Sequence, residues 1–388
     1  MNQGKYVFAQ LMAFVSHNDF NKCVTKYSGD YKIKDFSCWN QFLCMAFGQL
    51  THRESLSDTI TCLKINSAKL YHLGICKAVA KSTLSIANEK RDWRIYQDFA
   101  LKLIDEARQL YGSENQLELD IKQDVFALDA TVIDLCLNLF RWAQFRRKKA
   151  AVKIHTLLDL KNSIPEIIFI TGGSVHDVNI LDLIPFKEDS YYVMDRAYID
   201  FQRLHRIHLA KAYFILRAKS NFKFVRVSSR KVDKTTGIRC DQVIRLKNQL
   251  VSTYYPESFR RIKYYDSEQD RMFVFLTNNT KAKAVEIAYL YKCRWQIEVF
   301  FKWIKQHLKI KSFWGHSPNA VKTQIWIAIS VYVLVIIVKK KLNLTHSMYE
   351  ILQIVSTNIF DKTPLYELFS KTEYQNIKER IYNQLNLF

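Results

Sequence analysis

The sequence predicts a mixed α/β fold preceded by a helical part. From Met1 to about Glu118, apolar residues recur every three or four positions, which is the spacing of amphipathic helices. From about Asp120 the pattern changes to short β-like runs, first in succession and then alternating with helical stretches. Strands and helices in that order are typical of a mixed sheet covered by helices. The length of 388 residues fits two domains, or one domain with insertions.

Composition favours a nucleic-acid partner. The chain carries 58 Lys and Arg against 37 Asp and Glu, a net charge of +21, while 48% of its residues are hydrophobic. That apolar share excludes a disordered protein. The charge favours nucleic acid over a membrane surface, because Lys and Arg neutralise phosphates; a solvated basic face without a partner is the alternative. The chain has only 9 Gly and no phosphate-binding loop, so we expect no nucleotide cofactor.

The cysteines and the apolar segments predict a cytoplasmic protein. None of the 8 cysteines falls in a C-x-x-C pair, so we expect reduced core thiols rather than a zinc knuckle or a redox motif. The N-terminus lacks the features of a signal peptide. The apolar run Ile325–Val338 is shorter than the roughly 18 to 20 residues that a bilayer core requires. We therefore expect a buried helix or strand there and no membrane partner.

Within the helical part, Gly74–Cys76 indicates a turn that leads into a capped helix near Ser82. Two hypotheses fit these residues about equally: a helix-turn-helix that reads DNA, and an ordinary helical pair with a polar outer face. The segment from Ser82 to Arg94 is the best candidate in the chain for contacts with base edges. Basic residues surround it: Lys77, Lys81, Lys90, Arg91 and Arg94.

After Asp120 the elements follow in order. Residues 221–272 are β-like and strongly basic, and we interpret them as an insertion in the α/β part. A strand at Phe273–Leu276 and a long helix from about Ala282 to His307 come next. Before the insertion we expect strands at Val125–Leu128, Val152–Leu158, Ile167–Thr171, Tyr191–Met194 and Phe214–Leu216, and helices at Val178–Ile184 and Phe201–Lys211.

Two carboxylates stand at the ends of apolar strand runs. Asp129 follows Val125–Leu128, and Asp195 follows Tyr191–Met194. An aspartate in such a place usually caps a turn or meets a basic partner. Two of them in one sheet offer a second interpretation, because carboxylate oxygens are the natural ligands of a hard divalent cation.

A third acid belongs to a stripe on the long helix. Tyr291, Arg294, Glu298 and Lys305 are spaced so that, at about 100° per residue, they fall within roughly 60° of arc. On spacing alone, a solvated ion pair between Arg294 and Glu298 explains the stripe best.

The three blocks together resemble a known family. The segment Tyr291–Lys305 has the pattern Tyr-x2-Arg-x3-Glu-x6-Lys, which resembles the signature of the DDE transposases of bacterial insertion sequences, in the family named after insertion sequence four. Leu128–Thr131 resembles the family's first aspartate block, and Met194–Asp200 resembles the second, where Ala197 replaces the common glycine. The similarity covers about Val125 to Lys311, with the blocks in the family's order.

The resemblance implies a ribonuclease-H-like catalytic core with a β-rich insertion. It implies that Asp129, Asp195 and Glu298 converge to hold two Mg²⁺ ions, with Mn²⁺ able to take their place. The enzyme would be a DNA transposase that binds terminal inverted repeats, cuts its element out through a hairpin intermediate, and inserts it into target DNA. Its partners would be both DNAs and a second copy of the chain, in a bacterial cytoplasm and at the nucleoid when DNA is bound. Residues expected to grip the DNA are Tyr291, Arg294, Lys305, Arg196 and Tyr198.

The same resemblance suggests five segments and a few supporting residues. The family's hairpin step uses an aromatic residue of the insertion, often Trp, to hold a flipped base; residues 221–272 contain no Trp, which leaves Tyr254, Tyr255 or Phe259 as substitutes. His155 and His176 lie near the core blocks in the sequence. Each is either a group that supports the catalytic residues or a structural histidine, and histidines in such places are more often structural. We expect a helical DNA-binding or accessory domain at 1–118, the core at 119–220 and 273–345, the insertion at 221–272, and a helical C-terminal region at 346–388.

Two other functions stay open at this point. One is that of an inactive transposase descendant that only binds DNA. The other is that of a metal nuclease of the same fold that never joins strands. The presence of all three acids argues against the first of these.

Overall fold

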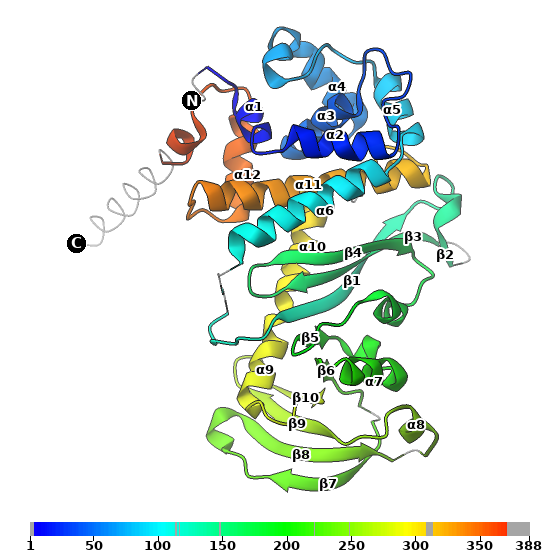
Figure 1. The fold of residues 1–388 in the computed structure, drawn as a ribbon, viewed down its shortest axis with the longest axis vertical. Coiled ribbons are helices and arrows are strands. Elements are labelled where there is room, and N and C mark those ends of the chain that lie inside the picture. The colour runs from blue at the N-terminus through cyan, green and yellow to red at the C-terminus, as the bar shows by residue number, and fades with distance from the viewer. Residues whose placement is uncertain are drawn as a thin grey trace, which may run out of the picture. The chain divides into compact units, whose positions relative to one another are not determined.

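The computed structural model describes residues 4–112, 115, 117–146, 149–220, 222–247, 249–307 and 313–370. The chain forms two compact units. One combines the N-terminal segment up to Gly112 with the residues from Lys302 onward, and the other holds the residues from Ser113 to Phe301. Figure 1 shows the elements of both.

The first unit is helical. Its centre is α11 (Pro318–Lys341), which packs against α3, α5, α6 and α12. The unit contains segments from both ends of the chain, and the N-terminal helices pack with α11 in one core. The other helices of this unit are α1 (Val7–Met12), α2 (His17–Lys26), α3 (Cys38–Leu50), α4 (Leu56–Ile65), α5 (Lys81–Lys90), α6 (Arg94–Tyr111) and α12 (Met348–Thr357), with the 3₁₀ helices η1 (Ser67–Lys69) and η2 (Tyr71–Leu73).

Of the buried helix or strand expected at Ile325–Val338, the structure has the helix, α11, which is longer than that run. Ser317 caps its N-terminus by accepting a hydrogen bond from Ala320 N, Pro318 stands in its first turn, and Lys339–Lys341 lie in its last turn, where positive charge is favourable. By length and composition α11 could cross a membrane, but 94% of its most apolar window is buried inside the protein. That burial is typical of a core helix.

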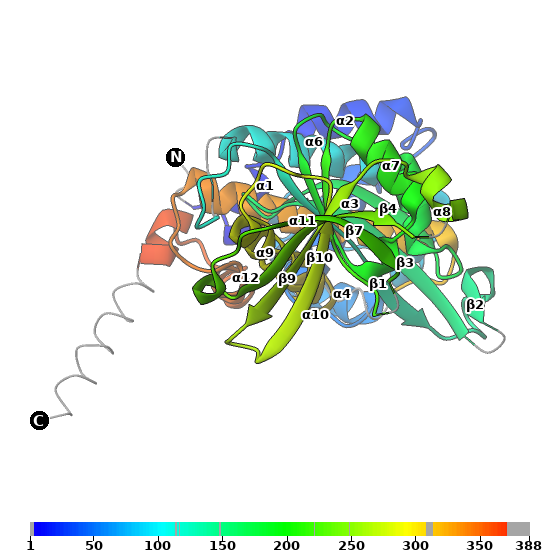
Figure 2. The ribbon, with the colours of Figure 1, turned by 90° about the horizontal axis from the view of Figure 1, so that it is seen from below.

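The second unit is built on a ten-stranded mixed sheet, as the α/β prediction expected. The strand order is β2-β3-β1-β5-β6-β10-β9-β8-β7, with β4 paired to β3. Seen from below in Figure 2, successive strands are rotated relative to one another, which is the usual twist of a sheet. The strands are β1 (Val125–Leu135), β2 (Gln144–Arg146), β3 (Lys149–Asp159), β4 (Ile164–Gly172), β5 (Tyr191–Met194), β6 (Tyr213–Arg217), β7 (Phe224–Arg230), β8 (Ile238–Leu246), β9 (Phe259–Asp266) and β10 (Arg271–Thr277).

Helices cover both faces of this sheet. On one face, α7 (Phe201–Leu209) packs through Leu204 and Ile207 against Phe214 and Leu216 of β6. On the other, α9 (Ala284–Cys293) contacts β5, β6 and β8, and the rings of Phe275 and Tyr291 are 4.7 Å apart. The remaining elements of this unit are η3 (Arg141–Ala143), η4 (Asp177–Leu183), η5 (Arg196–Tyr198), η6 (Lys234–Thr236), α8 (Gln249–Tyr254) and the first half of α10 (Trp295–His307).

Two details differ from the sequence prediction. The helix expected at Val178–Ile184 is the 3₁₀ helix η4. The long helix expected from Ala282 to His307 is two helices, α9 and α10, because Arg294 N bonds to Tyr291 O and Ile297 N to Arg294 O, three residues back instead of four.

The basic insertion has the expected β-like character. Its strands β7, β8 and β9 extend the core sheet beyond β10. The boundaries of the five expected segments stay predictions.

Candidate active site

Parallel pairing brings the two strand-end aspartates together. In the sheet, Leu128 of β1 pairs with Met194 of β5, and Met194 pairs with Leu216 of β6. The next residue along each strand is Asp129, Asp195 and Arg217, respectively. These three positions therefore lie side by side at one edge. The sequence pattern predicted that the first strand ends before Asp129, but β1 continues to Leu135 in its pairing with β3. Its pairing with β5 stops at Leu128.

Local backbone contacts hold both aspartates. Asp129 Oδ1 accepts a hydrogen bond from Ala130 N at 2.8 Å. Asp195 is the N-cap of η5, and its Oδ1 accepts from Ala197 N at 2.8 Å. Each carboxylate is thus oriented by the chain immediately after it, and one oxygen of each remains for another partner.

Arg294 joins the first aspartate to the helix glutamate. Its Nη1 donates to Asp129 Oδ2 at 2.8 Å, and its Nη2 donates to Glu298 Oε1 at 2.5 Å. The ion pair between Arg294 and Glu298 that spacing suggested is therefore present, and Asp129 takes part in it as well. The Asp129 side chain is 23% exposed and that of Glu298 is 59% exposed, so the bridge runs from the protein interior to its surface.

Burial and charge act against each other at this bridge. Burial raises the pKa of Asp129; the positive charge of Arg294 opposes this rise, whereas the charges of Asp195 and Glu298 add to it. Burial by itself would lower the pKa of Arg294, but the charge of Asp129 and that of Glu298 raise it above its ordinary value. Asp129 is thus a desolvated carboxylate that requires a cation beside it.

The donor set suits a hard cation. Asp129, Asp195 and Glu298 offer only carboxylate oxygens, which are the ligands that Mg²⁺ and Mn²⁺ prefer. In the described ranges, no group of three or more His, Cys, Asp or Glu side chains is close enough to hold a metal as arranged. Between two of the acids stands instead the Arg294 guanidinium. The three side chains have the donor atoms of a divalent-cation site but are not arranged as one while Arg294 bridges Asp129 and Glu298.

An aromatic cavity of about 410 Å³ opens beside these acids. Phe273 and Phe275 stack at 5.9 Å with 9° between their planes, and Phe275 packs on Tyr291. The guanidinium groups of Arg217 and Arg271 lie over the Phe273 ring, at 5.2 and 5.6 Å. Such alternating rings and cations are typical of sites that bind nucleic-acid bases by stacking. The cavity is lined by Arg217, Tyr264, Asp266, Gln269, Arg271, Phe273, Phe275, Ala288, Tyr291, Lys292, Arg294, Trp295 and Glu298.

The structure separates the predicted DNA contacts. Tyr291 and Arg294 line the aromatic cavity, and Arg196 is exposed. Tyr198, in contrast, is 1% exposed, so a direct contact of its side chain with DNA is wrong for this conformation. Lys305 lies on the part of α10 that belongs to the helical unit, and its role stays a prediction.

Tyr198 has a different relation to the site. Its hydroxyl is buried and, among the described residues, has no hydrogen-bond partner. Burial raises its pKa, and the nearby charge of Asp129 raises it further. Tyr198 therefore stays a neutral hydroxyl beneath the acidic edge.

Most of the suggested substitutes for a base-holding Trp are unavailable. Tyr255 and Phe259 are buried in the core under α7, and the Tyr255 hydroxyl is 2.7 Å from His208 Nδ1. Tyr254 is exposed but lines neither the aromatic cavity nor the acidic edge.

The two histidines near the core blocks differ in environment. His155 is fully buried, with Nε2 2.9 Å from Thr171 Oγ1 and Nδ1 3.8 Å from Asp177 Oδ1. His176 is exposed. His155 thus has the contacts of a structural histidine.

The expected DNA-reading helix is α5, and its surroundings argue against a helix-turn-helix. Residues 66–80, including η1 and η2, separate α4 from α5, whereas that motif has a turn of about three or four residues. The predicted side-chain cap is also absent, because α5 begins after Ala80.

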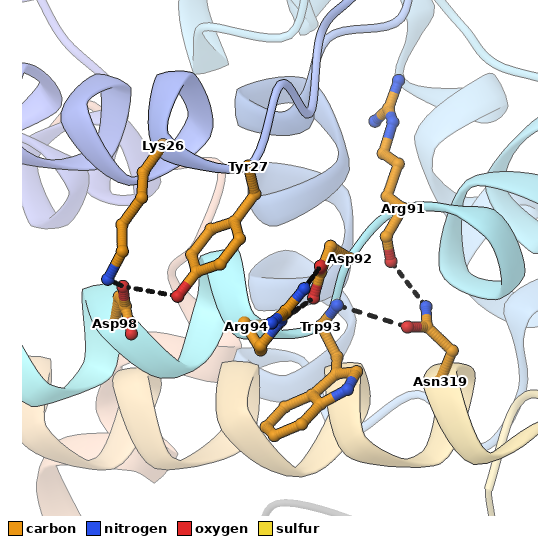
Figure 3. Close-up of polar contacts among 8 residues, drawn as sticks. All are labelled: Lys26, Tyr27, Arg91, Asp92, Trp93, Arg94, Asp98 and Asn319. Atoms are coloured by element: carbon orange, nitrogen blue, oxygen red, sulfur yellow. Dashed lines mark hydrogen bonds and ion pairs between the residues drawn. The ribbon is translucent and has the colours of Figure 1, made fainter.

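Two of the basic residues around α5 already have partners within the chain. Arg91 is buried and donates to Ser37 O, Phe36 O and Gln41 Oε1. Figure 3 shows Arg94 paired with Asp92, and Asn319 of α11 donating to Arg91 O. The exposed polar face of α5 consists of Lys81, Ser82, Thr83, Glu89 and Lys90.

Sequence reasoning missed Arg217 and the paired rings. Arg217 follows an apolar strand run, as Asp129 and Asp195 do. In a chain with 58 Lys and Arg, however, a basic residue at a strand end is no signal of a functional site. Phe273 and Phe275 alternate along a predicted strand, which places them on one face, yet periodicity does not tell which face is open.

Comparisons with known proteins show the family. The family described as Transposase DDE domain matches residues 120–334, and a family described as a domain of unknown function (DUF4372) matches residues 3–76. The protein y4zB of Sinorhizobium fredii, which carries the name of a transposase, is 33% identical over 239 residues, 61% of this chain and 66% of that protein.

Two further relatives carry the names of transposases for insertion sequence elements. One, for element IS5377 of Geobacillus stearothermophilus, is 30% identical over 53% of this chain and 54% of its own length. The other, for element IS4SA of a Synechocystis strain, is 28% identical over 65% of this chain and 70% of its own length. The chain thus spans just under two thirds of y4zB and about half of the IS5377 protein.

Proposed function

The chain belongs to the Transposase DDE domain family, and on that premise we propose that it is a DNA transposase of an insertion sequence. It binds the terminal inverted repeats of its element, cleaves the element from donor DNA with a divalent cation, and joins it to target DNA. The observation that carries this proposal is the placement of three acids from distant segments: Asp129 and Asp195 follow paired strand positions, and Glu298 is joined to Asp129 through Arg294.

The core of the sheet supports a ribonuclease-H-like assignment. Strands β1, β5 and β6 are parallel, and β3 and β4 continue the sheet in antiparallel pairing. Asp129 and Asp195 lie on the two adjacent strands at the centre of this arrangement. A rigid sheet edge is a suitable place for catalytic groups, because it fixes their separation.

Asp129, Asp195 and Glu298 would hold the divalent cations, Mg²⁺ or Mn²⁺. When bound, such ions activate a water and stabilise the leaving oxygen of a phosphodiester. Arg294 must then release Asp129 and Glu298, and its guanidinium becomes available for a DNA phosphate beside the acids. In this scheme Arg294 holds the carboxylates in register before DNA and metal arrive.

The aromatic cavity supports a hairpin step. A hairpin requires a nucleotide to leave the base stack, and aromatic side chains stabilise such a base by stacking. Phe273, with Arg217 and Arg271 over its ring, is the best-placed stacking group next to the acids. It takes the part that the sequence assigned to Tyr254, Tyr255 or Phe259.

The partners follow from this function. The chain binds transposon-end and target DNA, for which its net charge of +21 is suited, and pairs with a second copy so that two ends are held together. We place it in the bacterial cytoplasm, at the nucleoid when bound to DNA, without a nucleotide cofactor.

The test is a cleavage and joining assay with the full chain, a donor DNA carrying inverted repeats, Mg²⁺ and a second, labelled duplex. A transposase produces 3′-OH ends that become covalently joined to the second duplex. Cleavage without joining would identify a nuclease of this fold, and binding without cleavage would identify an inactive descendant. The Asp195→Asn variant serves as the control for contaminating nucleases.

A further inference from the structure

A second cavity, of about 350 Å³, opens on the face of the sheet opposite to the aromatic cavity. Side chains of a strand alternate between its two faces. On β10, Phe273 and Phe275 line the aromatic cavity, whereas Met272 and Val274 line the second one. Arg217, at the end of β6, is the one described residue that lines both.

Among the described residues, four cations and no acid line this second cavity, which we call the cationic cavity. They are Arg196, Arg217, Lys219 and Arg261. Within the part of the chain that the structure describes, no ion pair involves Arg196, Arg217 or Lys219. Elsewhere on this unit, exposed basic groups do find acids, as Lys211 does with Glu188 and Arg206 with Asp182. Concentrated positive charge without internal neutralisation suits an external anion.

The floor of the cavity is apolar and preorganised. Phe222 and Phe224 stack at 5.9 Å with 16° between their planes, and the Arg261 guanidinium lies 4.9 Å from the centre of the Phe224 ring. Arg261 Nη1 also donates to Gln242 Oε1 at 3.1 Å. One of the four cations is therefore held in place before any ligand arrives, which lowers the entropy cost of binding.

The cavity adjoins the acidic edge. Arg196 directly follows Asp195, and Arg217 holds the position next to Asp195 on the neighbouring strand. The residues Tyr291, Lys292 and Arg294 are on the other side of the sheet, in the aromatic cavity. Cationic groups thus flank the acids on both faces.

From this arrangement we propose that the cationic cavity binds backbone phosphates of the DNA strand that passes through the active site. The strand crosses the sheet edge at Asp129 and Asp195, with Tyr291 and Arg294 contacting it on one side and Arg196, Arg217 and Lys219 on the other. An in-line displacement requires both sides of the scissile phosphate to be fixed, and the second cavity supplies the missing side. This inference rests on the proposed function and adds a specific phosphate site to it.

The experiment measures affinity of the full chain for a short labelled duplex across a KCl series, in Ca²⁺ so that the DNA stays intact. Arg196→Ala and Lys219→Ala are exposed changes outside the acidic triad, and unchanged melting temperatures would show that both variants fold. The control is Lys234→Ala, an exposed lysine of the basic insertion that lines neither cavity. Each of the two test variants should lower the slope of log affinity against log salt by about one, the signature of one lost phosphate contact, and the control should not.

A methylphosphonate scan locates the contact. Replacing the contacted phosphate by a neutral methylphosphonate should weaken the wild type but have no further effect on Lys219→Ala. If Arg196→Ala and Lys219→Ala have the same salt slope as Lys234→Ala while the wild type still binds and cuts DNA, the phosphate site is refuted and the transposase function stands. If the wild type neither binds nor cuts DNA, the proposed function itself fails.

Discussion

The Nη1 atom of Arg294 lies 2.8 Å from Oδ2 of Asp129, although 165 positions separate the two residues in the chain. The same guanidinium contacts Glu298, so one side chain neutralises two of the three acids that the family signature identifies. Without metal, a positively charged residue holds the place beside a desolvated carboxylate. This relationship links metal binding to the position of Arg294.

The first prediction follows from that link. In metal-free protein, Arg294→Ala should lower the free energy of unfolding by about 1–3 kcal/mol, less than the loss for a fully buried pair because both partners are partly exposed. Mn²⁺ should then raise the melting temperature of the variant more than that of the wild type, because no guanidinium competes for the carboxylates. Arg294→Lys keeps a positive charge but cannot donate to both carboxylates in the same geometry. Its Mn²⁺-induced rise in melting temperature should therefore lie between those of the wild type and Arg294→Ala. Equal Mn²⁺-induced shifts in all three proteins would show that Arg294 does not compete with the metal.

The second prediction concerns pH. Burial lowers the pKa of His155 to about 4, with the charge of Asp177 opposing the effect, whereas the unfolded chain titrates near 6.5. The unfolded state therefore binds the extra proton first as pH falls, so stability is complete above about 6.5 and declines towards pH 4, by about 3 kcal/mol in total. His155→Gln should flatten this part of the stability-pH curve measured by urea unfolding. Exposed His176→Gln should leave the decline unchanged, and a wild-type curve that is already flat would rule out a buried neutral His155.

The third prediction concerns a buried ion pair within the insertion. Arg260 donates to both oxygens of Asp241, at 2.7 and 2.6 Å, and the two side chains are 2% and 6% exposed. Asp241→Asn should cost about 3–5 kcal/mol because it leaves a buried guanidinium without its counter-charge.

Its control is Glu188→Gln, which breaks the exposed pair with Lys211 and should cost less than about 1 kcal/mol. The double change Arg260→Met with Asp241→Leu should recover most of the loss, as measured by chemical denaturation. Similar costs for the buried and exposed pairs would contradict this assignment.

The fourth prediction assigns recognition of the transposon ends to the helical unit. A core starting near Val125 is not a usable test, because it would remove α3, α5 and α6, on which α11 packs. Point changes on α5 avoid this. Changing Ser82 and Thr83 to Ala should reduce the preference for end DNA over random duplex by about 10-fold, the value of one good base contact. Thr25→Ala, an exposed change on α2, is the matched control. A preference that survives the α5 change would move recognition to another surface, with the insertion as the next candidate.

Local pattern and family signature predicted much of this protein. Strand β5, helix α7 and the buried course of α11 follow from periodicity within a few residues, and Asp129, Asp195 and Glu298 were recognisable as blocks in the right order. The break between α9 and α10 at Arg294 could not be predicted, because it accompanies a contact with Asp129 that no local pattern contains. For the same reason, the union of the N-terminal helices with α11 and the position of Arg217 beside Asp195 depend on tertiary pairing.

The central claim is that Asp129, Asp195 and Glu298 are the metal-binding acids of a DNA-cleaving site. The most direct measurement is the rate of Mg²⁺-dependent cleavage at a transposon end by Asp129→Asn, Asp195→Asn and Glu298→Gln, with affinity for the same DNA measured in parallel. We predict that each change lowers the rate by at least about 1,000-fold, equivalent to about 4 kcal/mol of transition-state stabilisation, while binding persists. A variant that binds and still cuts near the wild-type rate would remove that residue from the site and contradict the account.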